Sequence, residues 1–147
     1  MQNCTLPPAP QGWLWRLGLA SAAALTLAVS LSGCFTSAER SGQVLYEQHC
    51  GNCHGLDGKG LGQLMPPLAG ADYLTTQRAA LPCIVRQGLR GPVVVNGREY
   101  NGVMPAISRE ELADADVANI LNYIRTAWGN TATELITPQE VEAARCD

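Results

Sequence analysis

The chain has 147 residues, which is enough for one modest hydrophobic core plus whatever its two ends carry. Its 10 Lys and Arg are outnumbered by 13 Asp and Glu, so the net charge is −3. This mild acidity argues against a nucleic-acid partner, and the chain has no basic cluster that would hold it on an acidic membrane surface.

Residues 1–33 have the pattern of a signal segment. A lone Arg16 precedes an uncharged run that is shorter than the roughly 20 apolar residues of a comfortable membrane span. The run ends in Leu31-Ser32-Gly33-Cys34, which resembles the lipobox of bacterial lipoproteins, where cleavage falls just before the cysteine and that cysteine carries the lipid. We expect a lipid anchor at Cys34 on the periplasmic side of a bacterial membrane, inner or outer. An uncleaved anchor over residues 13–35 is the alternative.

Residues 34–40 are expected to tether the first helix. Thr36-Ser37-Ala38-Glu39 has the S/T-x-x-E form of a capping box, which predicts a helix from there to about His49. Gly42 and Tyr46 share one face of that helix because they are four residues apart.

The next stretch, Cys50-Gly51-Asn52-Cys53-His54, is the C-x-x-C-H pattern of covalent c-type haem attachment. Two thiols at this spacing can each add to one vinyl group at the porphyrin edge, which brings His54 under the iron as the proximal ligand. A thioredoxin-like dithiol would need a preceding buried strand. A zinc site would need two more Cys or His at short spacing, and the only other histidine is His49. The sequence therefore predicts one haem c held by Cys50, Cys53 and His54.

Short elements are predicted between this stretch and the last long helix. Residues 71–87 predict one or two short helices broken near Pro82, which can begin the second one. Residues 93–100 place the turn Asn96-Gly97 between a β-branched run and a segment with an aromatic residue, and this pattern predicts a small β-hairpin.

Two helices are predicted near the C-terminus. From Asp114 to Trp128 apolar residues repeat at helical spacing, with Asp114 as a cap and Gly129 as the end. Farther along, Thr137-Pro138-Gln139-Glu140 predicts the start of a final helix that runs to about Arg145. We expect residues 131–147 to form a tail that packs on the domain.

These features together resemble the single-haem class I cytochromes c. In that family an N-terminal helix with a glycine and an aromatic residue, here Gly42 and Tyr46, crosses the C-terminal helix. Ile120 and Tyr123 stand where the family packs this second helix on the pair.

The resemblance also assigns roles on both sides of the haem. Met65-Pro66-Pro67-Leu68-Ala69-Gly70 resembles the P-x-L-x-G segment, which implies that the Pro66 carbonyl accepts the other ring N–H of the haem histidine and that Leu68 packs on the porphyrin. Asn101-Gly102-Val103-Met104-Pro105 resembles the methionine loop, which implies Met104 as the distal iron ligand. Met1 is lost with the signal, and Met65 sits beside the proposed proximal-side proline.

We therefore predict a mostly α-helical cytochrome c-like domain over residues 41–130, with a β-hairpin insertion and a helical tail. The resemblance implies an electron carrier, not an enzyme, that cycles haem iron between Fe(II) and Fe(III) in a respiratory chain. Its partners would be a redox donor and a redox acceptor, with no small-molecule substrate. Two alternatives stay open: a fixed electron-entry subunit of a membrane oxidase or reductase, and a haem peroxidase or gas sensor if Met104 is not ligated.

Counting cysteines leaves two without a role. The signal accounts for Cys4, the lipid for Cys34 and the haem for two more. Cys83 and Cys146 are then an even pair in an oxidising compartment, which predicts a disulfide, with two separate thiols as the alternative. We expect this bond to staple the tail over the side of the domain that carries the hairpin.

Overall fold

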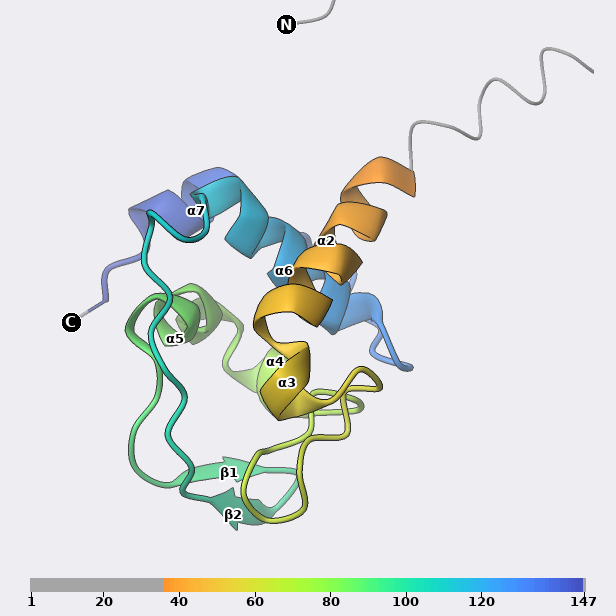
Figure 1. Cartoon of the computed structure of the whole chain (residues 1–147), viewed down its shortest axis with the longest axis vertical. Helices are drawn as coiled ribbons and strands as arrows, with labels where there is room; N and C mark the ends of the chain where they lie inside the picture. The colour runs from red at the N-terminus through yellow and green to blue at the C-terminus, as the bar shows by residue number, and fades with distance from the viewer. Residues whose placement is uncertain (1–35, 147) are drawn as a thin grey trace, which may run out of the picture. The chain divides into compact units, whose positions relative to one another are not determined.

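Two crossing helices, α2 (Thr36–His49) and α6 (Asp114–Thr126), frame the fold (Figure 1). The computed structural model describes residues 36–146. The predicted signal segment and the lipidation site Cys34 therefore lie outside the described residues. Residues 36–40, which we expected in a tether, belong to the first turns of α2.

The crossing is close because Gly42 of α2 has no side chain. A Cβ at this position would overlap the carbonyl oxygen of Asn119 on α6. One turn later, the buried ring of Tyr46 lies 5.6 Å from the ring of Tyr123 and 5.0 Å from that of Trp128, measured between centroids. The predicted packing of the glycine and aromatic pair against Tyr123 is thus confirmed.

Short elements occupy the chain between these helices. They are α3 (Gly51–His54), α4 (Tyr73–Thr76), a 3-10 turn (Arg78–Ala80), α5 (Leu81–Gln87), β1 (Val93–Val95) and β2 (Arg98–Tyr100). After α6 comes α7 (Pro138–Ala143). The prediction of a mostly α-helical fold with one small hairpin is confirmed.

The hairpin follows from its turn residues. Asn96 and Gly97 have φ values of 51° and 74°, and two positive φ angles in succession are what a two-residue hairpin turn requires. The strands pair antiparallel, with Val93 opposite Tyr100 and Val95 opposite Arg98. The hairpin lies at the end of the domain away from α7 (Figure 1).

Helix α6 differs from its prediction at both ends. Asp114 is its first residue and not its cap; the carboxylate of Asp116 instead accepts from the backbone N–H of Ala113 at 3.2 Å. The helix stops at Thr126, although the apolar repeat continues to Trp128. Trp128 has a φ of 52° and so lies outside the helix, but its ring packs on Tyr46. The apolar repeat therefore continues past the end of the helix because Trp128 contributes to the core.

Helix α7 begins as predicted. The Thr137 hydroxyl accepts from the N–H of Glu140 at 3.2 Å, and the Glu140 carboxylate accepts from the N–H of Thr137 at 2.7 Å. The helix ends at Ala143, two residues before the predicted end. Buried Val141 and Ile136 fix the tail to the domain. Within residues 36–146, none of the helices has the length and apolar character needed to cross a membrane.

Candidate functional site

The hydrophobic core is hollow. A cavity with about 720 Å³ of empty space, counting its mouth, is lined almost entirely by apolar atoms. Its walls include Leu81 and Val85 of α5 and Leu121 of α6, all buried. Protein interiors are close-packed and rarely contain large voids, so a cavity of this kind fits a large apolar body.

His54 ends α3 and lines this cavity. Its Nδ1 donates to the carbonyl oxygen of Pro66 at 3.1 Å, which leaves Nε2 with a free lone pair. Burial lowers the pKa of His54, and the hydrogen bond to Pro66 opposes this shift in part. The ring is therefore neutral at pH 7, the form in which imidazole binds a metal.

The two thiols of the C-x-x-C-H pattern lie around the same helix. Cys50 is the residue before α3 and lines the cavity, whereas Cys53 is exposed, and neither is in a disulfide. Burial, followed by the charge of Cys53, raises the pKa of the Cys50 thiol to about 11. A redox dithiol needs a thiolate near neutral pH, so this pKa argues against the dithiol alternative.

Met104 lines the cavity from a distant part of the chain. Its backbone pairs with Leu89, just after α5, through two hydrogen bonds of 2.9 and 3.0 Å. A Cβ at Gly88 would overlap the carbonyl oxygen of Met104, and a Cβ at Gly102 would overlap that of Leu64. The absence of side chains at Gly88 and Gly102 thus lets the backbone around Met104 lie close to the end of α5 and to Leu64.

A second, smaller cavity of about 430 Å³ adjoins the first. His54, Pro66 and Met104 line both cavities, whereas Cys53 and Met65 line only the second. The structure therefore brings His54 and Met104 to the walls of the same two adjoining cavities. Met65 lines the second cavity, so a Met65 variant is needed as a control for the assignment of Met104 as the ligand.

The remaining predicted haem contacts lie where the resemblance implies. Pro66 presents its carbonyl to His54, and Leu68 lines the first cavity. Leu68 is held by its backbone N–H, which donates to the carbonyl of Gly58 at 2.7 Å. Their roles toward a haem stay predictions.

These residues fit a haem c. The first cavity is apolar and large and is lined by the unpaired Cys50 thiol and by a neutral imidazole with a free nitrogen, and the unpaired Cys53 thiol lines the adjoining cavity. By contrast, residues 36–146 contain no group of three or more His, Cys, Asp or Glu that could hold a metal ion directly. Cys50, Cys53, His54 and Met104 are the residues that would bind the group.

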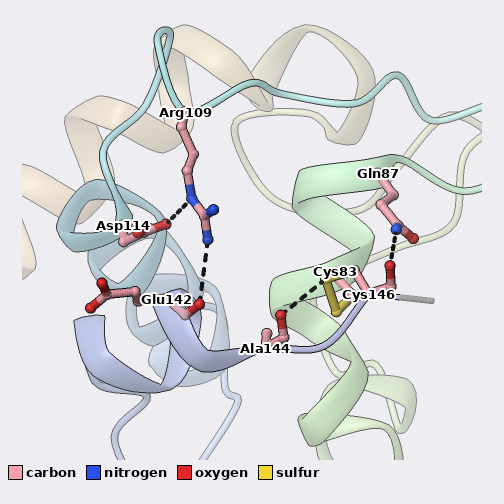
Figure 2. The surroundings of a disulfide bond; sticks show 7 residues. All are labelled: Cys83, Gln87, Arg109, Asp114, Glu142, Ala144 and Cys146. Carbon is pink, nitrogen blue, oxygen red and sulfur yellow. Dashed lines mark hydrogen bonds and ion pairs between the residues drawn. A yellow bond between two sulfur atoms is a disulfide. The ribbon is translucent and has the colours of Figure 1, made fainter.

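Cys83 and Cys146 are joined in a disulfide in the structure (Figure 2). The bond links α5 to the chain end that follows α7, and the Gln87 side chain donates to the carbonyl of Cys146 at 2.5 Å. The expectation that the tail covers the side of the domain that carries the hairpin was wrong. The tail packs on α6 and α5, away from the hairpin, because Ile136 and Val141 are buried there.

One residue beside the site was missed in the sequence. Arg86 of α5 is largely buried and contacts four groups between Ile107 and Asp114. Its partners are 21 to 28 residues away, so no local pattern could have identified it.

Comparison with known proteins gives consistent matches. The cytochrome c family model matches residues 40–128. Cytochrome c-552 of Thermus thermophilus is 36% identical over an alignment of 140 residues that covers 81% of this chain and 93% of that protein.

Other relatives are parts of larger enzymes. The cytochrome c subunit of a quinone alcohol dehydrogenase from Gluconacetobacter polyoxogenes is 32% identical over 68% of this chain, but the match covers 21% of that subunit. The cytochrome c subunit of gluconate 2-dehydrogenase from Pantoea cypripedii is 34% identical over 74% of this chain and 24% of that subunit.

Proposed function

Because this chain belongs to the cytochrome c family, which carries electrons on covalently bound haem c, we propose that it is a periplasmic carrier whose haem is held by Cys50, Cys53, His54 and Met104. The observation that supports this assignment best is that His54 and Met104, 50 residues apart, line the same two adjoining cavities. We also propose that Cys34 carries a lipid that keeps the domain at the membrane.

The chain's own groups suit this role. When bound, the haem supplies an iron that changes its charge by one electron. His54 is a neutral ligand of fixed orientation, since its Nδ1 is engaged by Pro66. The apolar cavity walls would exclude water from the bound group, and ligation by a methionine together with a histidine would raise its reduction potential.

We propose that the domain is not an enzyme. If His54 and Met104 both hold the iron, they would leave it no free position for oxygen, peroxide or another substrate. A peroxidase or gas sensor would require that Met104 leave the iron, and the two backbone hydrogen bonds between Met104 and Leu89 oppose such a movement.

Redox partners would dock where the haem edge comes nearest to solvent. Cys53 is exposed, and it shares the second cavity with Val103, which is 52% exposed. Leu61 and Leu64 nearby are at least 60% exposed. We propose that these apolar side chains meet an apolar face on the partner in a small, transient interface.

A second candidate function is that of a fixed cytochrome subunit in a membrane dehydrogenase or oxidase. It is favoured by the matches to cytochrome c subunits of quinone alcohol dehydrogenase and gluconate 2-dehydrogenase. Purification from native membranes separates the two candidates. A fixed subunit would co-purify at constant stoichiometry, whereas a carrier would separate from its partners and be reoxidised by an added terminal oxidase or reductase.

The ligand assignment has a direct spectroscopic test. Ferric wild-type protein should show the weak sulfur-to-iron absorption band of methionine-ligated haem, and Met104→Ala should abolish the band and lower the reduction potential. Met65→Leu is the matched control, because Met65 lines only the second cavity. A band that disappears in the Met65 variant and persists in the Met104 variant would refute the assignment.

A further inference from the structure

The backbone around Met104 is attached to the last turn of α5. Met104 and Leu89 exchange two hydrogen bonds, and the N–H of Ile107 donates to the carbonyl of Val85 at 3.0 Å. Position 88 must be glycine for this approach, since a Cβ there would overlap the Met104 carbonyl. The placement of the Met104 sulfur therefore depends on how firmly the segment after it is held against α5.

That segment, residues 105–113, has no helix or strand of its own. Its carbonyl groups need donors from elsewhere, since buried or half-buried backbone oxygens are costly to leave unpaired. The guanidinium of Arg86 supplies them. Its Nη1 donates to the carbonyls of Leu112 at 2.9 Å and Ser108 at 3.1 Å, with a longer contact of 3.4 Å to Ile107.

The other arm of the same guanidinium reaches the beginning of α6. Nη2 of Arg86 lies 2.6 Å from Oδ1 of Asp114, and the Arg86 side chain is 9% exposed. Its Nε is buried and has no hydrogen-bond partner among the described residues, which costs free energy that the other contacts must offset. Arg86 is therefore not an ordinary solvated surface arginine. Its planar guanidinium can donate hydrogen bonds to several acceptors at once.

We propose that Arg86 is a positioning residue for Met104: by holding residues 107–114 against α5, it keeps the Met104 sulfur where it would bind the iron. The inference rests on the proposed ligation of Met104. Arg86 does not touch the haem cavity and acts only through the segment. Its loss should release the methionine more often while the core, formed by other residues, stays folded.

The chain offers two matched controls. Arg109 contacts the same carboxylate, with Nε 3.3 Å from Oδ1 of Asp114, but its side chain is 56% exposed and reaches none of the three segment carbonyls. Val141 is a fully buried residue of α7 and takes no part in the contacts of Arg86, so Val141→Ala lowers stability while leaving those contacts in place.

The experiment measures how fast added imidazole displaces the methionine in ferric, haem-loaded protein, followed by loss of the sulfur-to-iron band. In Arg86→Gln we expect displacement to be about tenfold faster, a change of about 1.4 kcal/mol in the opening step. Arg86→Lys should fall between this variant and the wild type, because a single ammonium cannot reach all four acceptors. Arg109→Gln should stay within about twofold of the wild type, since an exposed ion pair contributes little.

Equal displacement rates in the wild type, Arg86→Lys and Arg86→Gln would overturn the inference. So would an acceleration in Val141→Ala as large as that in Arg86→Gln, because the effect would then reflect general destabilisation. If Arg86→Gln does not yield haem-loaded protein, Arg86→Lys decides, with a wild-type rate overturning the inference. A wild-type protein without the band would instead refute Met104 ligation itself.

Discussion

The Cys83–Cys146 disulfide closes a long loop, and its removal should measurably destabilise the domain. The two cysteines are 63 positions apart, so the loop contains 64 residues with both ends counted. In the chain-entropy description, a crosslink of this length restricts the unfolded chain by about 14 cal/mol/K, or about 4 kcal/mol at room temperature. This figure is an upper one, because any strain in the folded state subtracts from it.

The folded state should survive the change. The tail is also held by the burial of Val141 and Ile136 and by the Arg78 side chain, which reaches Glu140 and the carbonyl of Leu135, and these contacts do not involve the two cysteines. We therefore expect a Cys83→Ser and Cys146→Ser double variant to fold, bind haem and show the sulfur-to-iron band at full intensity. Its free energy of unfolding should fall by about 2 to 4 kcal/mol.

Guanidinium unfolding, followed by both helical circular dichroism and haem absorption, measures this difference. The denaturant slope should rise in the variant, because the unfolded chain exposes more surface once the crosslink is gone. The single Cys146→Ser variant should lose as much stability as the double variant. A loss below about 1 kcal/mol would contradict the entropic account, and two alkylatable thiols in denatured, unreduced wild-type protein would refute the bond itself.

Three further predictions follow from other parts of the chain. Gly42→Ala should lower the free energy of unfolding by about 1 to 3 kcal/mol, because its Cβ would overlap the Asn119 carbonyl; thermal unfolding at wild-type temperature would contradict the close crossing. The hydrogen bond from Arg86, and after it the one from Arg109, lowers the pKa of Asp114 in the folded protein. The ionised carboxylate therefore stabilises the fold above its unfolded pKa of about 4, and this stabilisation is lost as the pH falls toward the folded pKa. Asp114→Asn should therefore be less stable than the wild type at pH 7, with a gap that narrows toward pH 3; a gap independent of pH in chemical unfolding would refute this. Cys34→Ser should release haem-loaded protein from membranes or block its processing, and an unprocessed N-terminus in the wild type would favour the uncleaved anchor.

Local chemistry made parts of this protein predictable from its sequence. The positive φ angles of the hairpin turn fall on two adjacent residues, Asn96 and Gly97, and the cap of α7 is formed by Thr137 and Glu140, so each pattern carries its own structural signal. The C-x-x-C-H stretch is similar, since covalent attachment fixes the spacing of its residues.

Features that join distant segments were not predictable in the same way. The hollow core is lined by residues of α2, α3, α4, α5, α6 and β1 and of the loops between them, and no single stretch of sequence encodes a cavity. Trp128 continued an apolar repeat although its backbone had left the helix, because its ring packs on Tyr46. Asp114 had the residue type of a helix cap but is engaged by Arg86, a partner that only the fold brings near.

Helix α5 connects these features, although it has only seven residues. Side chains at helical spacing divide its surface: Leu81 and Val85 face the cavity, Cys83 carries the disulfide to the tail, and Arg86 holds the segment after Met104. The tail and the methionine segment are thus attached to different sides of one short helix. For this reason the loss of the disulfide should cost stability and leave methionine ligation intact, whereas the loss of Arg86 should speed the displacement of Met104 by more than its cost in stability explains. The two variants together separate the strength of the fold from the strength of the iron–sulfur bond.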